Sequence, residues 1–361
     1  MNILVTGVAG FIGSNFVYYY LKKHPEDSLI GFDALTYAGN LDNLTNIPEG
    51  EKKRFHFLKG DITDPEQIRV VFNRWNIGGV INFAAESHVD RSIHDPGIFL
   101  KTNILGTHSL LEVAKESWCN NGTWDKKNRF LQVSTDEVYG SLGPSGFFSE
   151  QTPLDPHSPY SASKAGSDLI VKAYHDTFGL PILITRCSNN YGPYQFPEKL
   201  IPLIIYRALN NQSLPIYGDG RQIRDWLYVI DHCSAIDLVF HKGELGEIYN
   251  IGGSNEQENI KIVQMILSIL RDLTDDQNIN DNLITYVRDR PGHDRRYAID
   301  SSKLKLELGW KPKTKFSDGI LHTVKWYLNN PEWVNNVISG EYLSFYQNNY
   351  RECCKFQSKN K

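Results

Sequence analysis

The sequence has few cysteines and no long apolar segment. Its 361 residues include five cysteines, an odd number, and none of them forms a CxxC pair. This pattern argues against a disulfide framework and a cysteine zinc site, and it favours a reducing compartment. No apolar run reaches the roughly 18 residues that a membrane helix needs. We therefore predict that the chain does not span a membrane.

Charge of one sign is not concentrated anywhere in the chain. The net charge is −4, and no block of like charges occurs. A nucleic-acid partner is not expected, because it would require a basic face. A small anionic ligand held by a few Arg and Lys side chains remains compatible with this composition. The strand pattern starts at Asn2 and leaves no room for a signal peptide, so we predict a cytoplasmic protein.

Short apolar runs alternate with amphipathic segments through the first half of the chain. This alternation is typical of an α/β fold with a doubly wound parallel sheet and helices on both faces. The strands read as nearly continuous apolar runs, as strands covered on both faces do. The expected strands are residues 2–5, 28–32, 54–58, 80–83, 129–133 and 181–186. The expected helices lie near 12–23, 64–76, 97–118 and 160–178.

The spacing of these elements changes after about residue 186, where proline, glycine and tyrosine become dense. We expect residues 1–186 to form the main domain, with return segments near 226–252 that include a strand in EIYNIGG. Residues 187–225 and 253–340 are expected to form a smaller, interleaved C-terminal lobe that carries helices near 199–210 and 259–273. Residues 341–361 read as a polar tail.

A glycine-rich turn follows the first expected strand. The segment ILVTGVAGFIGSNF places Gly7, Gly10 and Gly13 between an apolar strand and an amphipathic helix. Glycines allow a tight turn and let the backbone approach a pyrophosphate, and the helix N-terminus favours its negative charge. The strand–turn–helix context makes this spacing much more specific than a lone glycine triplet.

Acidic residues end the second and third expected strands. Asp33 follows Gly13 by 20 residues, where a carboxylate binds adenosine ribose hydroxyls and repels a 2′-phosphate. No Arg or Lys follows immediately, so NAD is favoured over NADP. Asp61 and Ile62 lie where an adenine edge could be bound. The alternative is that Asp61 only shapes the turn before the next helix.

Tyr160 and Lys164 are spaced by four residues in SPYSASKAG, so a helix would place them on one face. A tyrosine ordinarily titrates near pH 10, too high for a base at neutral pH. A nearby ammonium group and the positive nicotinamide ring both favour the phenolate. Lys164 could also bind the nicotinamide ribose.

The chain resembles the extended short-chain dehydrogenase/reductase family over roughly residues 2–330. The resemblance rests on TGxxGxxG, a serine or threonine at a strand end, and YxxxK. The resemblance implies a Rossmann domain that keeps NAD bound and a smaller C-terminal lobe that binds a nucleotide sugar. It also implies a homodimer through helices of the Rossmann domain.

The stretch QVSTDEVYG places two acids side by side at the end of an expected strand. Thr135, Asp136 and Glu137 resemble the triplet of the nucleotide-glucose 4,6-dehydratases in this family. The segments AAESHVDRS, RCSNNYGPYQFPEKLIP, GRQIRDWLYV and RDRPGHDRRYAID match the same enzymes. The expected substrate is therefore dTDP-glucose, with UDP-glucose as the alternative, on the route to rhamnose or other deoxysugars.

The resemblance implies a role for each catalytic residue. Tyr160 takes the O4 proton while hydride leaves C4, and Thr135 hydrogen-bonds the C4 oxygen. Glu137 removes the C5 proton, and Asp136, kept protonated, donates to the departing C6 hydroxyl. Adjacent acids in a closed site push their pKa values apart, which suits this division. The spacing alone does not order the two acids.

Further ligand contacts follow from the matching segments. Those implied for the cofactor are Phe11, Ile12, Thr36, Ala84, Ala85, Ser87, Thr102 and Asn190, besides Gly7, Gly10, Gly13, Asp33, Asp61, Ile62, Tyr160 and Lys164. Those implied for the substrate are Ser87, Thr135, Asn189, Lys199, Leu200, Pro215, Ile216, Tyr217, Arg224, Asn259, Asp289, Arg290 and His293. A guanidinium such as that of Arg224 suits a diphosphate. No metal is expected, because the spacing around His88 and His293 does not resemble a metal site.

Two positions depart from the family pattern. Val8 stands where relatives often have glycine, and it would be tolerated only with a negative φ. Ala34 stands where relatives usually carry lysine, which would weaken adenosine binding slightly.

Three other functions compete with dehydration as interpretations of this sequence. A 4-epimerase or a decarboxylase on the same scaffold is disfavoured by the Asp136–Glu137 pair. A non-catalytic NAD-sensing regulator predicts the loss of Tyr160, Lys164 or the acids, and all of these are present.

Overall fold

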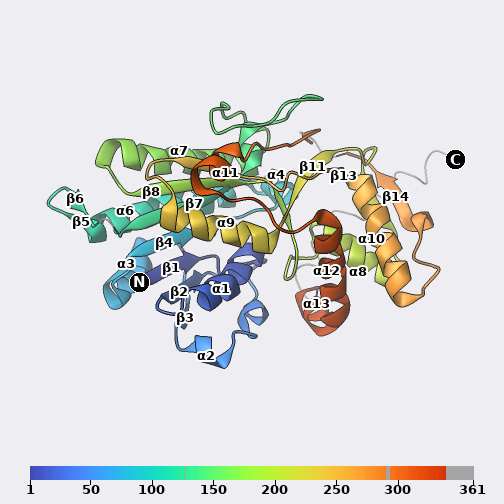
Figure 1. The fold of residues 1–361 in the computed structure, drawn as a ribbon, viewed down its shortest axis with the longest axis horizontal. Helices are drawn as coiled ribbons and strands as arrows, with labels where there is room; N and C mark the ends of the chain where they lie inside the picture. The colour runs from blue at the N-terminus through green and yellow to red at the C-terminus, as the bar shows by residue number, and fades with distance from the viewer. Residues whose placement is uncertain (126, 290–292, 339–361) are drawn as a thin grey trace.

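A computed structural model describes residues 1–125, 127–289 and 293–338. At its centre lies a parallel sheet of seven strands (Figure 1). In spatial order these strands are β12 (Ile248–Ile251), β8 (Ile182–Cys187), β7 (Arg129–Thr135), β4 (Gly79–Asn82), β1 (Asn2–Thr6), β2 (Ser28–Asp33) and β3 (Phe55–Lys59). The strand order reverses between β1 and β4, which opens a crevice at the carboxyl ends of these two strands.

Helices cover both faces of this sheet. One face carries α1 (Phe11–Lys23), α9 (Val229–Lys242) and α11 (Ser302–Leu308). The other face carries α3 (Pro65–Trp75), α6 (Thr107–Trp118) and α7 (Pro159–Phe178). Side chains alternate along β1, so Ile3 and Val5 pack with α1 and α9 while Leu4 packs on the opposite side. The expected doubly wound sheet is confirmed.

A second lobe, with its own apolar core, lies beyond the carboxyl ends of the strands (Figure 1). A three-stranded sheet joins β9 (Asn189–Tyr191), β11 (Ile223–Tyr228) and β13 (Glu256–Glu258), and β10 (Leu214–Tyr217) pairs with β14 (Ile284–Val287). The helices of the lobe are α8 (Leu200–Leu209), α10 (Asn259–Thr274), α12 (Phe316–Asn329) and α13 (Pro331–Ile338). The lobe boundary expected at residue 340 and the polar tail lie outside the described residues.

Shorter elements connect these layers. They are η1 (Leu41–Leu44), α2 (Glu49–Lys52), α4 (Val89–His94), the hairpin of β5 (Cys119–Asn120) and β6 (Thr123–Trp124), η3 (Asp136–Tyr139) and η4 (Asp281–Leu283). No helix in the described part of the chain is long and apolar enough to cross a membrane.

The predicted strands agree closely with the structure, and the strand expected in EIYNIGG is β12, which joins the sheet beside β8. The single helix expected at 97–118 needs correction. It consists of α5 (Pro96–Phe99), a π-helical segment η2 (Leu100–Gly106) and α6. The π-helical segment η2 ends at Gly106, where a Cβ would lie 2.6 Å from the side chain of Ile62. Close packing against the loop after β3 therefore requires glycine at this position.

Candidate active site

Two glycines of the turn between β1 and α1 are packed too tightly to accept a side chain. Gly7 has a φ of +67°, and a Cβ there would lie 2.7 Å from the Ala84 nitrogen. A Cβ on Gly13 would lie 2.2 Å from the Gly7 carbonyl oxygen. Gly10 precedes the first turn of α1, whose residues Phe11, Ile12 and Gly13 present the amides of the helix N-terminus. The turn therefore forms a narrow backbone cradle suited to a pyrophosphate.

Asp33 joins this turn to the end of β2. Its carboxylate accepts hydrogen bonds from the Ala9 amide at 2.9 Å and the Leu35 amide at 2.8 Å. Burial raises the pKa of Asp33, and the two amides oppose that shift. Val8 is buried and is not among the described residues with positive φ, so the condition set for a valine there is met.

The other predicted cofactor contacts come from several elements, and some have structural partners. The Asp61 carboxylate accepts the Thr63 amide at 2.8 Å, and Ile62 is buried in the core, so Asp61 does shape the turn before α3. Ala84 donates its amide to the Thr6 hydroxyl at 3.2 Å. The remaining positions lie after β2 (Thr36), after β4 (Ala85 and Ser87), on η2 (Thr102) and on β9 (Asn190).

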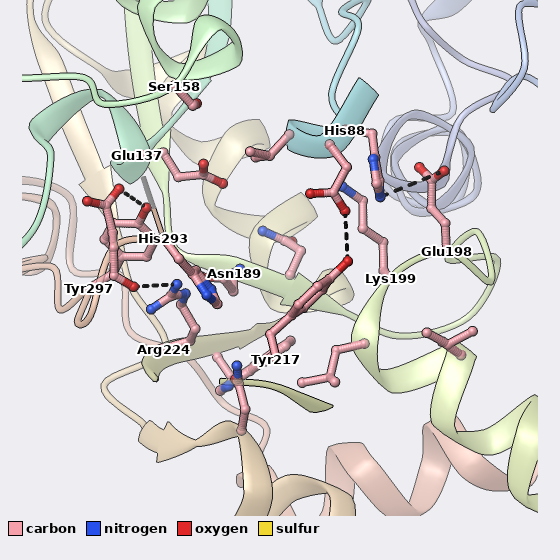
Figure 2. Close-up of a pocket in the computed structure, with 18 of the residues that line it drawn as sticks. His88, Glu137, Ser158, Asn189, Glu198, Lys199, Tyr217, Arg224, His293 and Tyr297 are labelled. Atoms are coloured by element: carbon pink, nitrogen blue, oxygen red, sulfur yellow. Dashed lines mark hydrogen bonds and ion pairs between the residues drawn. The ribbon is translucent and has the colours of Figure 1, made fainter. Parts of the chain in front are cut away.

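Two acids begin the short helix η3, directly after β7. Thr135 ends the strand, and its hydroxyl accepts the Glu137 amide at 3.3 Å. Asp136 is only 1% exposed, whereas Glu137 is partly exposed and points into the central cavity (Figure 2). Burial raises the pKa of Asp136 well above its usual value, and the negative charges of Glu137 and Asp225 raise it further. Both effects favour the neutral carboxylic acid form of Asp136 over the carboxylate.

Tyr160 and Lys164 lie buried on the first turns of α7. Ser158 caps this helix through reciprocal hydrogen bonds with Ser161, which fixes where the helix begins. Lys164 donates from Nζ to the Val133 carbonyl on β7 at 2.8 Å.

The structure differs from the expectation that the pKa of Tyr160 is depressed. Burial raises this pKa well above its usual value, with Glu137 and Cys187 adding to the effect, while the Thr135 side chain opposes it. Burial also lowers the pKa of Lys164. The protein alone thus keeps the phenol neutral, and formation of the phenolate depends on positive charge brought by a ligand.

A cavity of about 180 Å³ opens between the sheet and the second lobe (Figure 2). Eleven of the predicted residues line it, namely Glu137, Asn189, Asn190, Lys199, Leu200, Pro215, Ile216, Tyr217, Arg224, Asn259 and His293. Asp289 contacts one of these lining residues, because its carboxylate lies 2.5 Å from the Nδ1 atom of His293. Arg290 lies outside the described residues. The structure therefore brings together positions spread over more than 150 residues of sequence, from Glu137 to His293.

The Arg224 guanidinium is held firmly in the cavity wall. It donates to the carbonyl oxygens of Asp294 and Ile223, each at 2.8 Å, and lies 4.2 Å from the Tyr297 ring centre. The side chain is 7% exposed. A charged group fixed in this way is ready to bind an anion without further ordering.

Sequence reasoning missed ten residues that line the cavity. They are His88, Val89, Asp90, Ser158, Gln195, Glu198, Leu203, Trp226, Asp294 and Tyr297. Glu198 is buried, 3.9 Å from the His88 Nε2 atom, and it accepts a hydrogen bond from the Tyr37 hydroxyl at 3.2 Å. A signal was available for all of them except Leu203, because the other nine lie within the motifs quoted from the sequence.

Comparisons with known proteins give consistent matches over nearly the whole chain. Residues 4–323 match the family described as GDP-mannose 4,6 dehydratase. The chain is 54% identical over 342 residues to a dTDP-glucose 4,6-dehydratase of Xanthomonas campestris pv. campestris, covering 94% of this chain and 96% of that protein. It is 52% identical to a protein of the same name from Salmonella typhimurium, covering 97% of this chain and 99% of that one.

A solved structure agrees with these sequence matches. The crystal structure of dTDP-glucose 4,6-dehydratase from Bacillus anthracis in complex with NAD is 49% identical and has a TM-score of 0.83, covering 93% of this chain and 99% of that one. The chain therefore belongs to the nucleotide-sugar 4,6-dehydratase family, within the extended short-chain dehydrogenases/reductases.

Proposed function

We propose that this chain is an NAD-dependent dTDP-glucose 4,6-dehydratase, a hydro-lyase that forms dTDP-4-keto-6-deoxyglucose for deoxysugar biosynthesis. One observation carries the proposal: Asp136 is fully buried, which raises its pKa and favours the neutral acid, and it lies beside Glu137, which points into the cavity. Removal of water needs one acid to donate a proton and one carboxylate to accept one. Relatives about 50% identical over nearly their full length bear this name.

The crevice between β1 and β4 fits NAD. Gly7 and Gly13 pack directly against neighbouring backbone, which holds the turn close to the N-terminus of α1, where a pyrophosphate would bind. Asp33 holds its carboxylate at the end of β2, where it would bind ribose hydroxyls. When bound, NAD accepts hydride from C4 and returns it to C6, so the cofactor is not consumed.

The protein residues move the protons. Tyr160 removes the O4 proton as C4 is oxidised, and the Thr135 hydroxyl hydrogen-bonds the C4 oxygen. The ketone at C4 acidifies the C5 hydrogen, which Glu137 removes as a proton. Asp136 gives its proton to the C6 hydroxyl, which leaves as water, and C5 is reprotonated when hydride arrives at C6.

The second lobe would bind the nucleotide. We assign residues 187–225 and 253–340 to this role, and residues 1–186 with the return segments near 226–252 to the cofactor. Arg224 supplies a fixed positive charge for the diphosphate, and Lys199 donates from Nζ to the Ser87 carbonyl at 3.1 Å, joining the lobe to the loop after β4. The sugar would then lie between Glu137 and Tyr217 in the cavity.

A homodimer through α7 and η2 accompanies this function. These two elements pack against each other and expose large apolar side chains, with Leu105 57% and Leu169 60% accessible. Neighbouring Ile98 and Leu100 are also exposed. Burying such a patch against a second copy removes apolar surface from water. We place the enzyme in the cytoplasm, where its nucleotide substrates are made.

The direct test supplies the purified protein with NAD and either dTDP-glucose or UDP-glucose, and follows loss of one water by mass spectrometry. We expect the loss with dTDP-glucose. A loss with UDP-glucose alone would reverse the nucleotide preference and leave the dehydration intact. No loss with either sugar would overturn the proposed function.

A further inference from the structure

A cluster of histidine and aspartate side chains lies outside the catalytic cleft, where the C-terminal end of α1 meets α9. His24 follows α1, Asp27 precedes β2, and Asp237 and His241 lie on α9. Ligand atoms of His24, Asp27 and His241 all lie within 4.8 Å of one another, and no other such group of three was found among the described residues. The 13 residues of α1 separate the cluster from the glycine turn by about 20 Å.

The spacing in the sequence explains how four ligands converge. Asp237 and His241 are four residues apart on α9, so they lie on one face of that helix. His24 and Asp27 bracket the short turn that leads from α1 into β2. Because α1 and α9 pack side by side on the sheet (Figure 1), the two pairs face each other.

The distances are close to those of a coordination shell. The Asp237 Oδ1 atom lies 2.7 Å from His24 Nε2 and 3.5 Å from His241 Nε2. Ligand atoms around a tetrahedral zinc ion, at bonds near 2.1 Å, lie roughly 3.4 Å apart. Asp27 lies within 4.8 Å of both histidines, and one of its oxygens would have to turn from Met1 or Tyr20 towards them to complete four ligands. We propose that His24, Asp27, Asp237 and His241 form a structural site for Zn²⁺ or a similar divalent transition metal.

Outer partners of the kind found around metal sites are already in place. Lys23 donates from Nζ to Asp237 Oδ2 at 2.6 Å, leaving Oδ1 directed at the histidines. The buried Tyr20 hydroxyl donates to Asp27 Oδ2 at 2.8 Å, and the Met1 amino group binds the other oxygen of Asp27. Hydrogen bonds from such groups orient carboxylate ligands.

The proton balance is simple. The Tyr20 hydroxyl gives its single proton to Asp27, so His241 Nε2, 3.0 Å away, donates its own N–H to the tyrosine oxygen. His24 Nε2 likewise donates to Asp237 Oδ1. A bound cation would take the place of the hydrogens at these two Nε2 atoms, and the hydrogen that each imidazole keeps would then be on Nδ1. The cation would thus join α1, β2 and α9.

Binding of Zn²⁺ to the full chain, stripped of metal with a chelator, tests the proposal. Isothermal titration calorimetry should show one Zn²⁺ per chain with micromolar or tighter affinity, and Tm should rise when Zn²⁺ is added. The double variant His24→Gln/His241→Gln should bind at least about 100-fold more weakly, because it lacks two ligands. His322→Gln, at an exposed position on α12, is the matched control and should bind as the parent does.

X-ray absorption of the Zn²⁺-loaded parent protein provides a test that needs no variant. We expect two imidazole nitrogens and carboxylate oxygens around the metal. A shell containing sulfur, absence of Zn²⁺ binding, or unchanged stoichiometry and affinity in the double variant would each overturn the proposal. Dehydration at moderate temperature should not depend on the metal, so this result is independent of the proposed function.

Discussion

Replacement of Asp136 by asparagine separates hydride transfer from loss of water. Asparagine has the same shape as a neutral aspartic acid but cannot supply a proton to the C6 hydroxyl. General acid catalysis contributes about 10²–10⁴-fold, so we expect kcat for dehydration to fall by that factor, or about 3–5 kcal/mol of transition-state stabilisation. Oxidation at C4 depends on Tyr160 and should persist.

The same variant should not lose stability. The pKa of Asp136 is higher in the folded than in the unfolded chain. As the pH rises above about 4, the unfolded chain therefore loses this proton while the folded chain still holds it. The parent protein loses stability over this range, up to the folded pKa. Asp136→Asn removes this penalty. We therefore expect urea unfolding at pH 7 to show a variant at least as stable as the parent.

The assay is a single turnover with stoichiometric NAD and dTDP-glucose. Absorbance should report reduced cofactor that accumulates in Asp136→Asn, while mass spectrometry shows no loss of water. Asp155→Asn, an exposed acid outside the cavity, is the charge-matched control and should behave as the parent does. Normal dehydration by Asp136→Asn would refute the role of Asp136 as the acid. Failure to reduce NAD would show instead that the residue acts before water is lost.

Three further predictions concern the cofactor, acid stability and assembly. Gly13→Ala places a Cβ 2.2 Å from the Gly7 carbonyl oxygen, so NAD affinity measured by calorimetry should fall at least tenfold, whereas Gly50→Ala, with nothing within 4 Å, should bind normally. Burial lowers the pKa of His232 to about 3. The buried neutral imidazole therefore contributes its full stabilisation above pH 6.5, and this contribution is lost as the pH falls towards 3. His232 should thus lower the free energy of unfolding by about 2 kcal/mol between pH 7 and pH 5. His232→Asn should abolish this decrease, and an unchanged dependence on pH in the variant would contradict the low pKa of His232. Leu169→Glu puts a charge into the exposed apolar patch of α7, so sedimentation should show monomers, and a parent that is itself monomeric would exclude the dimer.

The elements that carry local signals could be predicted from the sequence. Continuous apolar runs predicted the strands of the main sheet, and TGVAGFIG predicted the turn between β1 and α1. The proposed catalytic set was reached through the family resemblance, on motifs that the structure places after a buried strand (Asp136 and Glu137) and on the first turns of α7 (Tyr160 and Lys164).

Other features depend on contacts between distant segments, which no local pattern encodes. Tyr297 lies within a quoted motif, but its place in the cavity, reached from a loop more than 100 residues after α7, depends on the tertiary fold. The raised pKa of Asp136 depends on burial and on the charges of Glu137 and of Asp225, which lies on β11 in the second lobe. Helix α9 was not predicted, although its apolar face packs on the sheet beside α1. The pairing of Asp237 with His24 spans 213 residues and appears only when the two helices are placed together.

The path of the chain between the two lobes limits how the molecule can be taken apart. The chain leaves the sheet after β8, forms β9, α8 and β11, and returns as α9 and β12. It leaves again for α10, comes back as α11 against β12, and ends in α12 and α13. A fragment ending at residue 186 would lack an edge strand and two covering helices, so genetic dissection at the lobe boundary should yield insoluble halves. Limited proteolysis within the cleft loops should likewise leave nicked chains that stay together until both lobes unfold as one unit.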